Sequence, residues 1–416
     1  MPRCFLRDNM PLDAVRERFN RYTREVLAWN LGQPERAGLP PEDAEQARRA
    51  AERAVRLHAA SGRSWLLLLG LGDGTLARML CGRLPSDRAL VILETDAERA
   101  RRVWPGLEED CGAQDPVLLA DASIWALLLL VRAAGMDAAN CTLCRNPAFA
   151  STELFKWQRL FLESASERVA PEAASQPISV LCMLHPEEPD LEDFFGHMPP
   201  WLHEVCVLWD GVLPPAAFKC PAPLRQSSRP LGAHFGEQRN AMLALCRTEW
   251  FLYLDADERL SPRTWELLPH VAVAPDLGGV LFPRRTFEGD EEHVRMGYGL
   301  WPDVQLRLLR NNAALRFEGA VHERVEGMEG RLALAADMPL LHYSHVRKDS
   351  RSLQRRLELF NRAAGEERHR LSGNYPRLPR AFFHQLDESL AGRLIMLPSM
   401  ENISTRSISH GNSPSR

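Results

Sequence analysis

Short runs of almost uninterrupted apolar residues recur along the chain and constrain its fold more than any other feature. They are WLLLL at 65–69, ALVILE at 89–94, ISVLCML at 178–184, EVCVLWD at 204–210 and WFLYL at 250–254. A strand with one face in water alternates apolar and polar residues, whereas a strand of a parallel sheet covered on both faces is apolar throughout. The sequence therefore predicts an α/β fold with mostly parallel sheets and helices on both faces.

The 416 residues leave room for two or three domains. Apolar residues at helical spacing from Leu12 to Trp29 predict packed helices near the N-terminus. The stretch ASERVAPEAASQP at 165–177 is rich in Ala, Ser, Glu and Pro, which is typical of a linker. The predicted divisions are helices over 1–60, a smaller Rossmann-like α/β domain over 61–165, a linker over 166–177, a larger α/β domain over 178–345, a helical region over 346–397 and a disordered tail over 398–416.

Composition and charge argue against several classes of protein. The net charge of -4 gives no electrostatic reason to expect nucleic acid as a partner. The 9 cysteines lack framework spacing, which disfavours a disulfide-stapled secreted domain. The N-terminal residues carry charge where a signal peptide is apolar, and the longest apolar runs fall far short of the roughly 20 residues that span a bilayer. We therefore expect a cytoplasmic protein without a transmembrane segment, and leave open a peripheral contact with the inner face of the membrane.

A cluster of acidic residues follows the last of these runs. Asp255, Asp257 and Glu258 come directly after WFLYL, at the end of a strand where α/β proteins bind their ligands. In an extended segment Asp255 and Asp257 would share one face and offer hard oxygen donors to Mn²⁺ or Mg²⁺. Such an ion could neutralise a diphosphate leaving group. The alternative is a pair of exposed turn carboxylates before a helix that starts at Ser261.

The neighbouring sequence favours the metal site through a family resemblance. The stretches HFGEQRNAMLALCRTEWFLYLDADERLSP at 234–262 and WPDVQLRLLRNNAALRFEGAVHERV at 301–325 resemble, in the same order, two segments of family 2 glycosyltransferases. The likeness covers about 178–345 and is closest to the lipopolysaccharide-core-type branch. It implies a GT-A fold that binds a nucleotide sugar, a DxD motif that binds a metal ion, and transfer with inversion.

The resemblance also implies roles for single residues. Asp210 matches an aspartate that contacts the nucleoside of the donor, and Arg239 matches an arginine close to the donor. Asp255 and Asp257 match the DxD motif, which holds the metal ion and the diphosphate; Asp255 is thus expected to serve both donor and metal. His322 matches an imidazole that can be a further ligand of the metal or phosphate.

Inverting transfer requires a general base near the acceptor hydroxyl. The sequence offers Glu323, Asp303 and Glu258 as carboxylates, and geometry must choose among them. We favour Glu323 over Asp303, because the adjacent His322 would place it beside the metal centre.

The predicted smaller domain carries a second motif. A G-x-G-x-G turn begins at Gly70, Glu94 ends the next strand, and Asp121 follows a third apolar stretch. This region resembles the cofactor half of S-adenosylmethionine methyltransferases, in which Glu94 could bind ribose and Asp121 could lie near adenine. It also resembles the N-terminal region of bacterial motility accessory factors. A tight turn that only packs a helix on a sheet is the alternative.

The leading hypothesis is a metal-dependent inverting glycosyltransferase, hexosyl or related. Its substrates would be a nucleotide sugar and a glycan, lipid-linked or protein acceptor, as in the synthesis of bacterial cell-surface glycans. Two alternatives stay open: an S-adenosylmethionine-dependent methyltransferase acting on a glycan, and a non-catalytic glycan-binding module. The sugar, the nucleotide and the acceptor are not specified by the sequence.

Overall fold

The structure is a computed structural model of the whole chain. It describes residues 10–29, 41–85, 88–111, 115–149, 151–169, 175–214, 218–232, 234–274, 276–320, 323–347 and 375–398. The described residues do not include His322 or the predicted tail beyond 398. They also leave out residues 348–374 of the predicted helical region.

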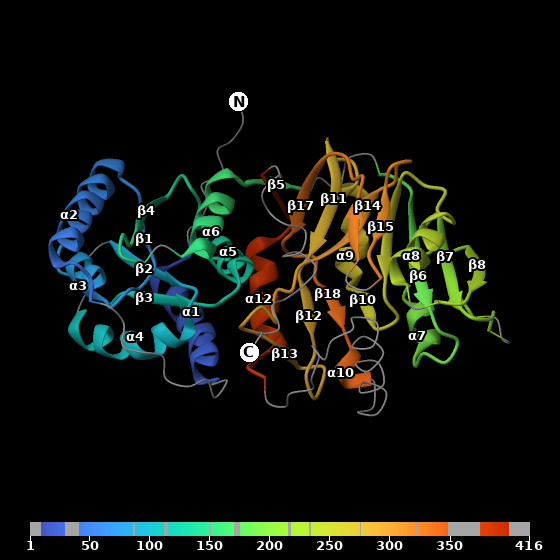
Figure 1. Cartoon of the computed structure of the whole chain (residues 1–416), viewed down its shortest axis with the longest axis horizontal. Helices are drawn as coiled ribbons and strands as arrows, with labels where there is room; N and C mark the ends of the chain where they lie inside the picture. Colours follow the sequence, from blue (N-terminus) through green and yellow to red (C-terminus); the bar gives the residue numbers. More distant parts are fainter. Residues whose placement is uncertain are drawn as a thin grey trace.

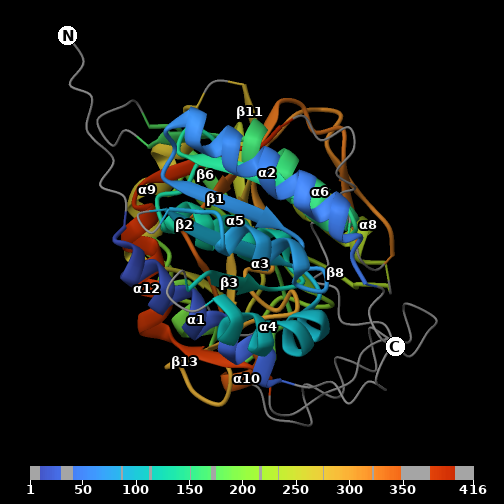
Figure 2. The same ribbon diagram turned by 90° about the vertical axis from the view of Figure 1, so that its left-hand side faces the viewer.

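The smaller sheet is built from the apolar runs of the N-terminal half. Its four strands are all parallel and are arranged in the order β3-β2-β1-β4. The strands are β1 (Trp65–Leu69), β2 (Ala89–Glu94), β3 (Val117–Ala120) and β4 (Cys141–Arg145). In Figure 2 this half faces the viewer, with β1, β2 and β3 lying side by side.

Helices cover both faces of this sheet, as its continuous apolar strands predict. On one face are α2 (Ala44–Ser61), α3 (Thr75–Cys81) and α4 (Ala97–Cys111), and on the other are α1 (Leu12–Ala28), α5 (Ile124–Ala133) and α6 (Thr152–Glu163). Helix α1 buries Val15, Phe19, Tyr22 and Val26, which recur at helical spacing on one side of the helix.

The larger sheet has nine strands in the order β5-β20-β17-β11-β14-β9-β6-β7-β8. One end, β9-β6-β7-β8, is parallel, and β14 runs antiparallel to both β9 and β11. The strands are β5 (Ala165–Arg168), β6 (Ile178–Leu184), β7 (Glu204–Asp210), β8 (Leu224–Arg229), β9 (Trp250–Leu254), β11 (Leu277–Phe282), β14 (Gln305–Arg310), β17 (Arg331–Ala335) and β20 (Arg393–Met396).

The strand order reverses beside β6. The chain passes from β6 to β7 and β8 on one side, and then returns to place β9 on the other side of β6. Such a reversal leaves a crevice outside the carboxyl ends of the two strands, because the connections leave them in opposite directions. Residues after Leu184 and after Leu254 therefore flank the ligand-binding edge of this sheet.

Shorter elements complete the larger half. Helices α7 (Leu191–Gly196) and α9 (Pro262–Val271) cover one face of the parallel strands, and α8 (Phe235–Leu243) covers the other. A small sheet, β10-β18-β12, starts shortly after the carboxyl end of β9, since β10 begins four residues after Leu254. The remaining elements are β10 (Glu258–Leu260), β12 (Arg284–Thr286), β13 (His293–Arg295), β15 (Arg316–Glu318), β16 (Arg324–Glu326), β18 (Leu340–His342), α10 (Ser344–Arg347), β19 (Arg377–Pro379) and α12 (Arg380–Leu390).

The two halves share one hydrophobic core. A single cluster of buried side chains joins α1, α5 and α6 to Phe287, Trp301 and α12, and Figure 1 shows α12 beside α5 between the halves. Strand β5, at the start of the predicted linker, pairs with β20 instead of crossing solvent, because β20 offers it an open sheet edge. The predicted domain limits themselves stay a prediction. Among the described residues, no helix combines the length and the apolar character that crossing a membrane requires.

Candidate active site

The acidic cluster forms a turn at the end of β9. The amide of Glu258 donates a hydrogen bond to the carbonyl oxygen of Asp255 at 3.0 Å, which closes a turn over Asp255 to Glu258. The expectation that these residues continue in an extended conformation is therefore wrong, because the chain must reverse its course here to start β10. The carboxylates of Asp255 and Asp257 consequently have different neighbours.

Two arginines neutralise Asp255. Arg307, on β14, donates from Nη2 to Asp255 Oδ2 at 2.8 Å, and Arg239 Nη2, on α8, lies 3.7 Å from Asp255 Oδ1. Both guanidinium groups also lie over the ring of Tyr253, at 4.5 Å for Arg307 and 4.9 Å for Arg239. Burial alone would lower the pKa of Arg239, but Glu323 and Asp255 outweigh it and raise the pKa above its usual value.

An alternating series of charges continues from Asp255 into the interior. The same Nη2 of Arg307 donates to Glu258 Oε1 at 2.6 Å, and Arg284 Nη1 lies 3.7 Å from that oxygen. Arg284 also donates to Asp303 from Nε at 2.9 Å. Glu258 is fully buried, and burial raises its pKa more than Arg307 lowers it. A carboxylate without exposed surface cannot contact an acceptor, so Glu258 is excluded as the general base.

Asp257 lies against an imidazole that sequence reasoning missed. Its Oδ1 is 3.7 Å from Nε2 of His342, and its Oδ2 accepts a short hydrogen bond from the Ser344 hydroxyl. Antiparallel pairing of β18 with β10 sets His342 opposite Glu258 and so beside the turn. Nδ1 of His342 is 3.0 Å from the Thr286 hydroxyl, and Nε2 is 2.9 Å from the Ser344 hydroxyl, which joins the imidazole to Asp257.

The two remaining candidate bases lie at opposite ends of the charge series. Glu323 Oε1 accepts from Arg239 Nε at 3.0 Å, and the Glu323 side chain is 14% exposed. Asp303, 13% exposed, accepts from Arg284 on Oδ2 and from Gln305 on Oδ1 at 2.9 Å. Because both oxygens of Asp303 are engaged, Glu323 is the more available carboxylate.

Asp210 stands apart from this series, at the end of β7. Its Oδ1 accepts from the amide of Leu231 at 2.8 Å, so the carboxylate holds the loop that follows β8. It lies two strands from β9 in the sheet order, at the same carboxyl edge as the turn. Its predicted contact with a nucleoside stays a prediction.

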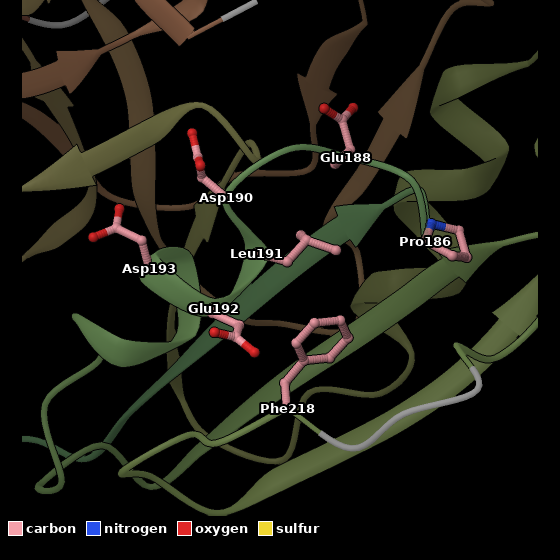
Figure 3. A pocket seen from close by; sticks show the side chains of 7 residues that line it. All are labelled: Pro186, Glu188, Asp190, Leu191, Glu192, Asp193 and Phe218. Atoms are coloured by element: carbon pink, nitrogen blue, oxygen red, sulfur yellow. The ribbon is translucent and has the colours of Figure 1, made fainter.

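An open pocket of about 500 Å³ lies after the carboxyl end of β6. Figure 3 shows the side chains that line it, with carboxylates around an apolar floor that includes Leu191 and Phe218. The lining residues are Pro186, Glu188, Asp190, Leu191, Glu192, Asp193 and Phe218. The pocket lies at the reversal of strand order, where an α/β sheet binds small molecules.

No protein-family model matches the chain, and no curated protein matches it. Among solved structures, TarS 1–349 of S. aureus in complex with UDP is 13% identical to this chain. The match covers 45% of this chain and 65% of the TarS chain, with a TM-score of 0.29. GalNAc-T7 with UDP, GalNAc and Mn²⁺ is 11% identical to this chain. The match covers 59% of this chain and 60% of the GalNAc-T7 chain, with a TM-score of 0.28.

The O-methyltransferase TomG from Streptomyces achromogenes, in complex with SAM, is 17% identical to this chain. The match covers 36% of this chain and 71% of the TomG chain, with a TM-score of 0.22. TarS and GalNAc-T7 are glycosyltransferases, so the similar structures include both classes that the sequence suggests. Likeness at this level does not decide between them.

Proposed function

We propose that this protein is a metal-dependent, inverting glycosyltransferase that moves a hexosyl or related sugar from a nucleotide sugar to a glycan, lipid-linked or protein acceptor. One observation carries the proposal: the acidic turn at the carboxyl end of β9 presents Asp257 to His342, at the edge where the strand order reverses. A carboxylate and an imidazole at such an edge suit an ion and a phosphorylated ligand. A cytoplasmic location stays a prediction from the sequence.

The residues around Asp257 fit a divalent ion. Asp257 supplies a hard oxygen, Nε2 of His342 lies 3.7 Å from it, and the hydroxyls of Thr286 and Ser344 fix the orientation of the imidazole. Within the described ranges, no three His, Cys, Asp or Glu side chains are grouped to hold a metal. Mg²⁺ and Mn²⁺ in phosphate sites commonly use one or two protein ligands and complete their shell with water and substrate phosphates. When bound, the ion would supply charge neutralisation to the departing diphosphate.

The chain's own side chains would do the remaining work. Arg307 and Arg239 fix Asp255, so that it can meet the donor in one orientation without much reorganisation. Arg239 would also lie close to the donor, as the resemblance implies. Glu323 would accept the proton of the acceptor hydroxyl as that oxygen attacks the sugar carbon, while the bond to the diphosphate breaks on the opposite side.

The direct test is consumption of the donor. The purified protein is incubated with single nucleotide sugars and Mn²⁺, and release of the nucleoside diphosphate is measured with and without EDTA. We expect one donor to be hydrolysed slowly in the absence of an acceptor, with the activity lost in EDTA and in Asp257→Asn but kept in Asp110→Asn, a control at an exposed site. The proposal fails if no nucleotide sugar is bound or consumed.

A further inference from the structure

The glycine turn of the smaller sheet is occupied by the chain itself. The carboxylate of Glu42 accepts hydrogen bonds from the amides of Asp73 and Leu76, both at 3.1 Å, and from Nδ2 of Asn146 at 2.9 Å. A Cβ atom built on Gly72 would lie 2.0 Å from Glu42 Oε1. A side chain from before α2 thus lies directly over the turn that a cofactor would approach.

The acidic residue at the end of β2 is also engaged. Glu94 is fully buried, and its carboxylate accepts from the amides of Leu71 and Asp96, both at 2.8 Å. Arg99 lies 3.3 Å from it and forms an ion pair. The predicted ribose contact would have to displace these partners, so Glu94 holds the turn together instead.

Asp121, at the end of β3, is linked through Tyr22 to a segment of the other half. Its carboxylate accepts a short hydrogen bond from the Tyr22 hydroxyl and one from the Ser123 amide at 2.7 Å. The ring of Tyr22 in turn contacts the ring of Trp301, with centroids 6.0 Å apart, and the backbone of Tyr298 and Gly299 lies close enough to lower the pKa of Asp121 against burial. The position predicted for an adenine contact is therefore filled by Tyr22, which packs against the loop at 297–303, and we call this loop the clamped loop.

A second set of contacts secures the same loop. The Tyr298 hydroxyl accepts from Arg101 Nη2 at 2.7 Å and lies 2.9 Å from the carbonyl oxygen of Val26. The Tyr298 ring meets the ring of Trp29 edge-on, with centroids 4.7 Å apart. Helices α1 and α4 thus hold the side chain of Tyr298, while Asp121 holds Tyr22 against Trp301 of the same loop.

The clamped loop needs such support. Tyr298 has a φ of 51° and Asp303 a φ of 35°, in the left-handed region that residues other than glycine rarely adopt. Such conformations persist where the surroundings impose them. The loop ends at Asp303, which pairs with Arg284 and so joins the charge series that leads to Asp255. Asp121 and the candidate active site are therefore linked through one short strained segment.

We propose that the smaller sheet uses its ligand-binding edge to hold the clamped loop rather than to bind a cofactor, and that Asp121 is a positioning residue for the active site. Glu42 and Glu94 close the rest of that edge. The clamp follows from the contacts alone. Its effect on the donor site rests on the proposed glycosyltransferase function.

Hydrogen exchange on the full chain tests the clamp without any substrate. Asp121→Asn keeps the size of the side chain but replaces one acceptor oxygen with a donor, so we expect amides at 297–303 to exchange at least about tenfold faster than in the wild type. Asp110→Asn, at an exposed site, should leave them unchanged. If Asp121→Asn does not fold, Tyr22→Phe and Tyr298→Phe each remove one hydroxyl and should show the same loop selectively exposed. Unchanged exchange at 297–303 in the folded variants would overturn the proposal.

Two titrations separate the clamp from the proposed function. S-adenosylmethionine and NAD should not bind the wild type in calorimetry, and binding of either with protection of residues 70–74 would overturn the clamp. The nucleoside diphosphate that binds the wild type with Mn²⁺ should bind Asp121→Asn at least about tenfold more weakly, because the end of the charge series is displaced. If faster exchange occurs but no nucleotide binds even the wild type, the clamp stands and the glycosyltransferase proposal fails.

Discussion

Arg307 bridges Asp255 and the buried Glu258, with its Nη2 atom 2.8 Å from one carboxylate and 2.6 Å from the other. A buried cation between two acids fixes both, because removing any one of the three leaves an uncompensated charge away from water. The geometry of the acidic turn thus depends on a residue from β14, a strand that is remote in sequence and adjacent in the sheet.

We predict that Arg307→Met lowers the free energy of unfolding by about 3–5 kcal/mol, as expected for breaking a buried ion pair. Arg310→Met is the matched control, since Arg310 lies on the same strand, is 49% exposed and pairs with Glu249 at the surface. That change should cost about 0–1 kcal/mol. Urea unfolding measures both, and equal losses in the two variants would show that Arg307 has no special role.

The orientation of His342 should depend on Thr286. We predict that Thr286→Val weakens Mn²⁺ binding by about 10–100-fold, because the imidazole loses one of the two hydroxyls that hold its direction. His342→Ala should abolish the binding. Calorimetric titration with Mn²⁺ and the stabilising nucleoside diphosphate provides the measurement, and wild-type affinity in both variants would remove His342 from the metal site.

Single substitutions of the two candidate bases, Glu323 and Asp303, distinguish their roles. With the donor identified, Glu323→Gln should reduce turnover by about 10²–10⁴-fold while donor binding persists, as for loss of a general base. Asp303→Asn should act mainly on donor affinity, since both oxygens of Asp303 are committed to Arg284 and Gln305. The opposite pattern, with turnover lost in Asp303→Asn alone, would assign the base to Asp303.

Stability should depend on the ionisation of Asp121. Burial raises the pKa of Asp121 from 3.8 to about 7, against the hydrogen bond from Tyr22, which lowers it. Between these values the folded state binds a proton that the unfolded state has lost, so the free energy of unfolding falls as pH rises from about 4 to about 7. The expected loss is on the order of 4 kcal/mol. The contribution of Asp121 to the free energy of unfolding is fully present below about pH 4, and it no longer changes above about pH 7.

Urea unfolding at intervals across this range tests the ionisation. In Asp121→Asn the same pH range should show a flatter profile, because the titrating carboxyl is gone. Tyr22 and Tyr298 face Asp121, and Arg101 faces Tyr298, so their substitution should shift the slope without removing it. Identical profiles for wild type and Asp121→Asn would show that another group is responsible.

The fold was accessible from the sequence because burial on both faces leaves a signature in each parallel strand. The runs at 178–184, 204–210 and 250–254 are strands β6, β7 and β9, and they meet at the predicted edge. The places of β14, between β11 and β9, and of β20, between β17 and β5, were not accessible, because strand direction and order depend on contacts between segments far apart in the chain.

The candidate site was accessible in part for the same reason. Asp255 and Asp257 were found because they follow a strand directly, whereas the turn that separates their carboxylates depends on β10 pairing with β18. His342 was missed, although an imidazole at the end of the apolar stretch LLH was a usable signal. Occupation of the glycine turn by Glu42 has no local signature, since Glu42 and Asn146 approach it from distant segments.

The most direct test of the central claim is thermal stability with a panel of nucleoside diphosphates, with and without Mn²⁺, in wild type and Asp257→Asn. A ligand that binds only the folded state raises the melting temperature by mass action. We predict that one diphosphate stabilises the wild type in a Mn²⁺-dependent manner and that Asp257→Asn, folded in the absence of ligand, loses this effect. An equal shift in both proteins, or no shift with any diphosphate, would contradict a metal-dependent nucleotide site at Asp257.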